Sequence, residues 1–141
     1  YQKNAEAYIA KLEKLDKDFH DVIDHAKRKE IIVGDRFPFL YFAKEFGLTY
    51  YAAFPGCSTD TEANPATIAF LVDKVKEDHI PVVFHIEMSN EQMSKAIAEA
   101  TDTKNELLNA VHNVSDEEFK KGVTYIDLMN HNVKVLKEAL N

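Results

Sequence analysis

The sequence predicts an α/β protein, a four-stranded parallel sheet with helices on both faces, preceded by a long amino-terminal helix. Residues 2–27 place apolar side chains at spacings of three and four, the period of an amphipathic helix. After residue 29, short apolar runs alternate four times with helical patterns, and strands joined by helical crossovers run parallel. The 141 residues are 45% hydrophobic and 29% charged, which is ordinary for one globular domain.

The predicted strands are short runs rich in β-branched and aromatic residues, and the fourth is the weakest of them. Helices fill the segments between the strands. In chain order the predicted elements are a helix over 2–27, a strand over 30–34, a helix over 38–46, a strand over 48–54, a helix from 64, a strand over 81–85, a helix after 89, a strand over 107–111 and a last helix over 124–140.

Helix ends are marked by residues that usually begin and end helices. Pro38 lies near the first turn of one helix and Gly47 follows its last residue. Asn64 is the expected N-cap of the next helix, with Pro65 at its first position.

Polar residues mark two later helix starts. Ser89 or Asn90 is expected to cap the helix that follows the third strand. Ser115 and Glu118 have the spacing of a capping box, in which each side chain accepts from the other residue's backbone.

Composition excludes several classes of function. Seventeen basic and 24 acidic residues give a net charge of −7, which argues against nucleic acid as a partner. The single cysteine, Cys57, excludes an internal disulfide and a thiolate zinc cluster. Residues 1–28 contain no apolar signal region and the first residue is Tyr1, so we expect a fragment of a longer protein.

Polar side chains follow each predicted strand, at the edge of the sheet where α/β proteins bind ligands. Imidazole and carboxylate groups together suit a divalent transition metal. The predicted metal ligands are His85, His112, Asp35 and Glu87, and the predicted cleft-lining residues are Arg36, Cys57, Ser58 and Glu62.

Other interpretations of these residues stay open. His85 and His112 could be hydrogen-bonded structural residues, and Cys57 could be a small packing residue. A small α/β enzyme could use Cys57 with a histidine, although no nucleophile-elbow motif is present. A non-catalytic, flavodoxin-like interaction domain is the third possibility, and no glycine-rich phosphate loop is found.

Three segments resemble the carboxy-terminal lobe of zinc/manganese ABC-transporter substrate-binding proteins. They are residues 34–48 (GDRFPFLYFAKEFGL), 56–65 (GCSTDTEANP) and 122–132 (GVTYIDLMNHN). The resemblance implies that residues 1–28 form a helix linking two lobes and that residues 29–141 form the second lobe. It also implies a non-enzymatic, extracytoplasmic, membrane-anchored lipoprotein that captures zinc or manganese. Its partners would be the missing amino-terminal lobe and an ABC permease in the membrane.

Two positions depart from the family's pattern. The family usually has a His or Glu where Arg36 stands, and an Asp where Val123 stands. Neither residue can ligate a metal at neutral pH. We therefore expect weak or absent metal binding by the fragment, with Arg36 paired to Asp35, Glu62 or Glu87. We also expect weak self-association into a homodimer through surfaces that the missing lobe would cover.

Overall fold

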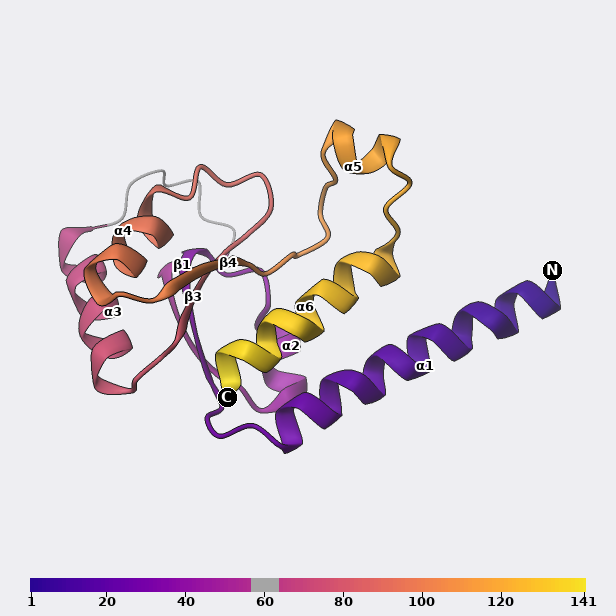
Figure 1. The fold of residues 1–141 in the computed structure, drawn as a ribbon, viewed down its shortest axis with the longest axis horizontal. Coiled ribbons are helices and arrows are strands. Elements are labelled where there is room, and N and C mark those ends of the chain that lie inside the picture. The colour runs from indigo at the N-terminus through magenta and orange to yellow at the C-terminus, as the bar shows by residue number, and fades with distance from the viewer. Residues whose placement is uncertain (57–63) are drawn as a thin grey trace.

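The structure is a computed structural model that describes residues 1–56 and 64–141 (Figure 1). Helices and strands alternate after the first helix, as the sequence predicts. The elements are α1 (Gln2–Asp24), β1 (Glu30–Arg36), α2 (Leu40–Phe46), β2 (Thr49–Phe54), α3 (Pro65–Glu77), β3 (Val82–His85), α4 (Gln92–Thr101), β4 (Lys104–Leu107), α5 (Asp116–Lys120) and α6 (Tyr125–Leu140).

The four strands form one parallel sheet in the order β2-β1-β3-β4. Residues in the middle of β1 and β3 are inaccessible to solvent because these strands are covered on both faces. Val33 of β1 pairs with Phe84 of β3, and His85 at the end of β3 pairs with Leu107 of β4. The predicted four-stranded parallel sheet is confirmed.

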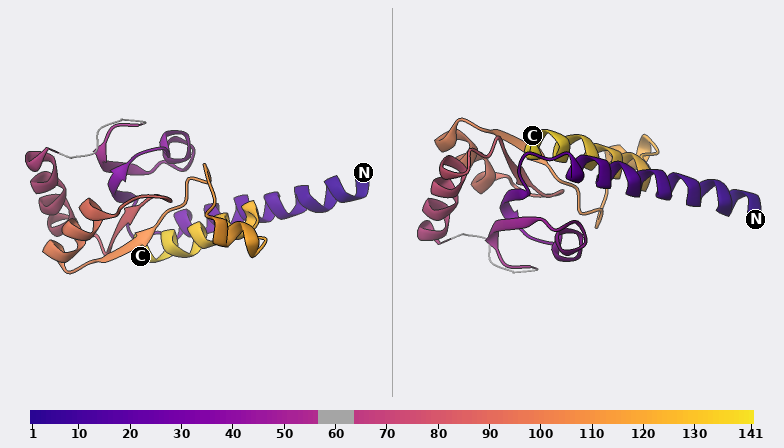
Figure 2. Two further views of the ribbon diagram at one scale, coloured as in Figure 1. Left: turned by 90° about the horizontal axis from the view of Figure 1, so that it is seen from above. Right: turned by 90° about the horizontal axis from the view of Figure 1, so that it is seen from below.

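Successive residues of each strand point to opposite faces, so the sheet has two apolar layers. Ile31 and Val33 pack with α1, α2 and α6 in the larger core. Ile32 and Val83 pack with α3 and α4 in the smaller one. Figure 2 shows the two helical layers on either side of the sheet, and helices on both faces are therefore confirmed.

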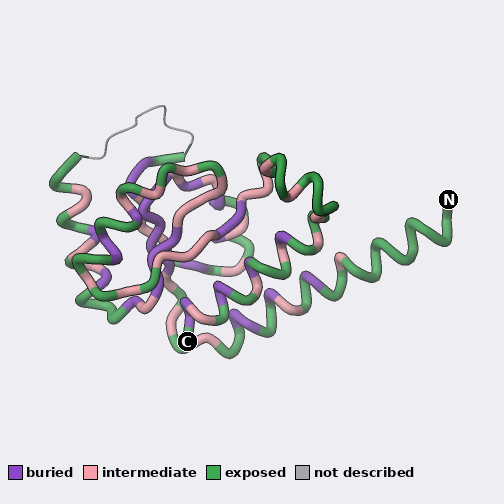
Figure 3. The backbone as a smooth tube through the Cα atoms, turned by 45° about the horizontal axis from the view of Figure 1, so that its top comes forward, coloured by how far each residue is buried: buried purple, intermediate pink, exposed green. Residues whose placement is uncertain are grey.

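The first helix packs against the rest of the molecule only through its second half. Its buried residues are Leu15, Phe19, Val22 and Ile23, which contact α6 and α2. The apolar stripe continues through Tyr8 and Ile9, but both side chains are exposed. Figure 3 shows this amino-terminal part extending away from the body. Among the described helices, none has the length and apolar character needed to cross a membrane.

The fourth strand lies earlier in the sequence than predicted, over Lys104–Leu107 instead of 107–111. This edge strand is mostly polar and none of its residues is fully buried, so its hydrophobic signal is weak. The apolar run that suggested a strand instead enters the core as a loop, with Leu108 and Asn109 both buried.

The start of α4 also differs from the prediction. Its N-cap is Glu91, in the left-handed conformation, rather than Ser89 or Asn90. The two predicted residues still accept from this turn, because Ser89 Oγ accepts from Glu91 N and Asn90 Oδ1 accepts from Gln92 N. They act one turn ahead of the helix, as Asx-type and Ser-type turns do.

Three other helix starts have side-chain caps. Asn64 accepts from the backbone of α3, as predicted, with Pro65 at the first helical position. The predicted capping box at Ser115 is present at α5. A second capping box, formed by Thr124 and Asp127, begins α6 and was not predicted.

Candidate functional site

The carboxyl ends of β1 and β3 line a hollow of about 250 Å³ at the predicted ligand-binding edge of the sheet. Strand β1 contributes Asp35 and Arg36, and the segment between β3 and α4 contributes Glu87 and Ser89. The remaining lining residues are Phe54, Ile86, Met88, Asn90 and Met93. The hollow therefore brings two of the four predicted metal ligands to one place, together with the predicted cleft residue Arg36.

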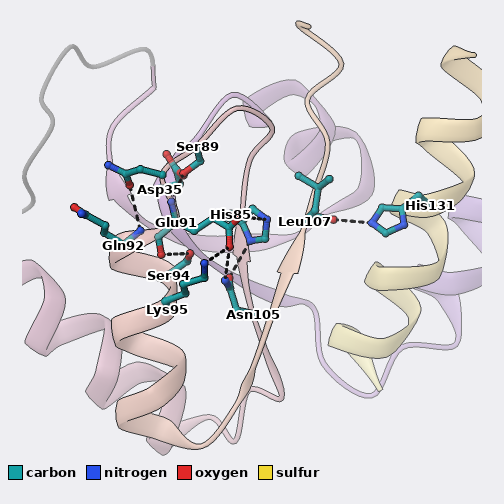
Figure 4. A network of polar contacts seen from close by, with 11 residues as sticks. Asp35, His85, Ser89, Glu91, Gln92, Ser94, Lys95, Asn105, Leu107 and His131 are labelled. Carbon is teal, nitrogen blue, oxygen red and sulfur yellow. Dashed lines mark hydrogen bonds and ion pairs between the residues drawn. The ribbon is translucent and has the colours of Figure 1, made fainter. Parts of the chain in front are cut away.

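Asp35 is buried at this edge and ties two elements together. Its Oδ1 accepts from the backbone N of Arg36 at 2.8 Å. Its Oδ2 accepts from the hydroxyl of Ser89, which in turn accepts from Glu91 N at 3.0 Å (Figure 4). Oδ1 thus caps a backbone amide at the end of β1, and Oδ2 holds this end to the turn before α4, so both oxygens have a structural use.

His85 lies on the α4 side of the sheet, the same side as Val83 of its strand. Its Nδ1 is 2.9 Å from Asn105 Oδ1, and its Nε2 is 3.8 Å from Glu91 Oε1 (Figure 4). The Lys95 ammonium lies 3.1 Å from the other oxygen of Glu91. The hydrogen bond from Lys95, followed by the field of His85, lowers the pKa of Glu91. His85 is therefore part of a polar cluster between β4 and α4.

Glu87 uses both carboxylate oxygens on the loop that follows β4. Oε2 accepts from the backbone N of Ala110 at 2.7 Å, and Oε1 accepts from the backbone N of His112 at 2.9 Å. The side chain of Glu87 is only 9% exposed, whereas that of His112 is 62% exposed. His112 Nδ1 lies 3.9 Å from Glu87 Oε1, so the imidazole stands beside this carboxylate at the surface.

Two buried asparagines hold the same loop from the other side. The Asn132 side chain accepts from Asn109 N and donates to Asn109 O, each at 2.8 Å. The Asn109 side chain accepts from Val111 N at 2.7 Å, and Val111 has a φ of 60°, a strained conformation for a β-branched residue. The sequence prediction missed Asn132, although a polar residue on the apolar face of the last helix was the available signal.

The predicted metal ligands thus lie in three neighbourhoods. Asp35 accepts a hydrogen bond from Ser89. His85 lies beside Asn105 and Glu91. Glu87 accepts from the backbone of the loop that carries His112. Across residues 1–56 and 64–141, no three His, Cys, Asp or Glu side chains are grouped so that they could hold one metal ion. The expected convergence of all four side chains on one ion is not seen there.

The predicted cleft residues are only partly described. Cys57, Ser58 and Glu62 lie outside the described residues. Arg36 lines the hollow, and its backbone N–H donates to Asp35. The expected ion pair between the Arg36 guanidinium and a carboxylate stays a prediction. His112 follows β4 by five positions instead of ending it, because the strand ends at Leu107.

Comparison with known proteins places this fold and edge in context. Residues 1–139 match the family described as ZnuA, zinc-uptake complex component A, periplasmic. The high-affinity zinc uptake system protein ZnuA of Bacillus subtilis (strain 168) is 36% identical over 140 residues, which are 99% of this chain and 43% of that protein. The zinc-binding lipoprotein AdcA of Streptococcus pneumoniae (strain ATCC BAA-255 / R6) is 32% identical over 139 residues, 99% of this chain and 27% of that protein. The chain spans less than half the length of these two curated relatives.

Solved structures show the same architecture. The metal-dependent lipoprotein YcdH from Bacillus subtilis superimposes with a TM-score of 0.82 at 36% identity, covering 100% of this chain and 53% of that chain. The Zn(II)-bound ZnuA-like domain of Streptococcus pneumoniae AdcA gives a TM-score of 0.78 at 32% identity, covering 99% of this chain and 51% of that chain.

The fold and its polar edge therefore define an α/β unit of the class found in metal-binding lipoproteins. The family match covers nearly every residue, so this chain belongs to the ZnuA family of zinc-uptake components. The resemblance predicted from the sequence is confirmed.

Proposed function

We propose that this chain is part of an extracytoplasmic substrate-binding protein that captures zinc and delivers it to an ABC permease for import. The observation that carries the proposal is the match to the zinc-uptake family over residues 1–139. Relatives that cover 99% of the chain at 32–36% identity are named for zinc uptake or zinc binding. A membrane-anchored, extracytoplasmic location is proposed from the same names, because one of these relatives is called a lipoprotein.

We propose further that His112 is the side chain through which this unit meets the metal. Among the four predicted ligands, His112 has the most exposed side chain at this edge of the sheet, and its imidazole suits zinc. Asp35 and Glu87 use both carboxylate oxygens on other groups of the protein. His85 is occupied by Asn105 and lies close to Glu91.

A single imidazole gives little affinity, so the other ligands have to come from outside the described residues. The chain spans 53% and 51% of two similar solved chains, which leaves room for a second lobe that supplies them. In this arrangement the ion is held between two lobes, and the protein binds and releases its cargo without chemical change. We therefore propose a binding function, and not the thiol enzyme that Cys57 would allow.

Calorimetric zinc titration of the 141-residue chain and three variants tests this proposal. Wild type is expected to bind zinc with a Kd in the micromolar range or weaker. The corresponding free energy of binding is about −8 kcal/mol or less negative. His112→Ala should abolish measurable binding, whereas His85→Ala should keep most of it.

The matched control is His79→Ala, which removes an exposed histidine from the turn between α3 and β3. This turn lies at the amino ends of the strands, away from the proposed site. Unchanged zinc binding in His112→Ala would remove His112 from the metal site. Failure of the wild-type chain to bind any zinc would contradict the proposal that this unit contributes a ligand.

A further inference from the structure

We propose that Glu87 is a positioning residue for metal capture: it does not ligate the ion but fixes the backbone of the loop that presents His112. The inference rests on the proposed function, because it takes His112 to be the ligand from this unit. It replaces the prediction that Glu87 itself ligates the metal.

The geometry of the carboxylate supports this role. Its two oxygens accept from Ala110 N at 2.7 Å and from His112 N at 2.9 Å, so the side chain spans the residue between them. Glu87 is itself 9% exposed, and a carboxylate buried with two backbone donors is well satisfied where it is. Moving it to coordinate an ion would leave the half-buried amide of Ala110 and the amide of His112 without their protein acceptor.

The spanned residue explains why the loop needs holding. Val111 has a φ of 60°, in the left-handed region that β-branched residues rarely adopt. An extended backbone at Val111 would relieve this strain, so the hydrogen bonds on both sides of Val111 are what hold it in the left-handed region. Glu87 supplies two of them, and Asn109 supplies a third through Val111 N at 2.7 Å.

The charge of Glu87 also lies beside the imidazole. Nδ1 of His112 is 3.9 Å from Glu87 Oε1, which is too long for a hydrogen bond, so the carboxylate positions His112 through the loop backbone and not through the ring. Holding that backbone in place lowers the entropy lost on binding.

Two variants separate the clamp from a simple electrostatic effect. Glu87→Gln keeps the side-chain length but puts an N–H donor in front of one of the two amides. Glu87→Asp keeps the charge, but its shorter side chain cannot reach both amides at once. Each variant should raise the zinc Kd by about tenfold or more, the size of effect typical of a group that orients a metal ligand. Glu99→Gln, on the exposed face of α4, is the matched control and should leave the Kd unchanged.

The metal-free chain provides a readout that is independent of binding. Amide hydrogen exchange, followed by NMR, should accelerate at Ala110 and His112 by about fivefold or more in both Glu87 variants, because a backbone hydrogen bond is lost. Amides of β1 and β3 should keep their protection, which shows that the fold is intact.

The outcomes distinguish this inference from the proposed function. If His112→Ala weakens zinc binding and the two Glu87 variants bind like wild type, the positioning role is wrong and the proposed function stands. If both Glu87 variants weaken zinc binding while amide exchange at Ala110 and His112 stays as in wild type, Glu87 acts on the metal directly and the inference is overturned. If His112→Ala binds zinc like wild type, the proposed ligand is wrong, and the role of Glu87 in presenting it falls with it.

Discussion

Removing the Asn132 side chain should destabilise the protein strongly. Asn132 lies on the buried face of α6, 4% exposed, and it satisfies both backbone groups of Asn109, which is 3% exposed. One bond runs from Asn109 N to Asn132 Oδ1 and the other from Asn132 Nδ2 to Asn109 O, each at 2.8 Å. Asn132→Ala removes both partners and leaves a buried donor and a buried acceptor unsatisfied.

The magnitude follows from those two groups. Each buried polar group left without a partner costs about 1–3 kcal/mol, so the pair costs about 4 kcal/mol. Alanine has the higher helix propensity and returns about 0.5 kcal/mol. The expected net loss is therefore about 3.5 kcal/mol, which for a chain of this size lowers Tm by about 10 °C.

Urea unfolding followed by circular dichroism measures this loss directly. Asn130→Ala is the matched control, because Asn130 lies in the same helix and is exposed. The control should be neutral or slightly stabilising. A loss below about 1 kcal/mol for Asn132→Ala would show that the loop relaxes or that solvent replaces the asparagine, and it would refute the reasoning.

Two further predictions concern the body of the sheet, both measured by urea unfolding. In Gly34→Ala the new Cβ would lie 2.6 Å from the Ser94 Cα, so α4 has to move away from β1 at a cost of about 2–3 kcal/mol; Gly47→Ala, whose Cβ meets nothing within 4 Å, should lose only about 1 kcal/mol from its positive φ. Burial, followed by a hydrogen bond to Asp78 and the charge of Asp78, raises the pKa of Glu30 above 4.5. A raised pKa means that ionised Glu30 destabilises the folded state, so Glu30→Gln should add about 1 kcal/mol at pH 7. The gain should shrink as the pH falls through the raised pKa of folded Glu30 towards 4.5 and should be lost below that, where wild-type Glu30 is protonated in both states; a constant gain would contradict this.

The sheet could be predicted from the sequence because its central strands carry a strong signal. Residues 31–33 and 82–84 are continuous apolar runs that both faces of the sheet bury, and Gly47 and Asn64 mark helix boundaries by their own conformational preferences. These features are local, so a single sequence contains them.

The fourth strand could not be predicted in the same way. Its residues Lys104 to Leu107 form an edge with no fully buried side chain, and they are held to β3 by backbone pairing and by the hydrogen bond between Asn105 and His85. Leu108 carries the apolar signal but belongs to a loop that is held in place by Asn132, 24 residues later in the chain. That contact is non-local, and no pattern within the segment encodes it.

The candidate site shows the same limit. Residue types at strand ends correctly predicted that Asp35, Glu87 and His112 lie at one edge of the sheet. The sequence could not show the hydrogen-bond partners of these side chains, because several of them lie in other loops, such as the Ser89 hydroxyl that donates to Asp35. Both oxygens of Glu87 accept from backbone amides in a loop more than 20 residues away.

The distribution of polar bonds at this edge bears on how such a unit can bind a metal reversibly. The carboxylates of Asp35 and Glu87 accept hydrogen bonds from backbone N–H groups and a hydroxyl, and these bonds fix the loops around the hollow. A rigid edge with one exposed imidazole contributes geometry and little affinity of its own. Under the proposed function, tight capture then requires ligands from the rest of the protein to close on His112, and separation of those parts is enough to release the ion. Under the proposed function, a single weak ligand on a rigid edge therefore favours release of the zinc ion to the permease as much as its capture.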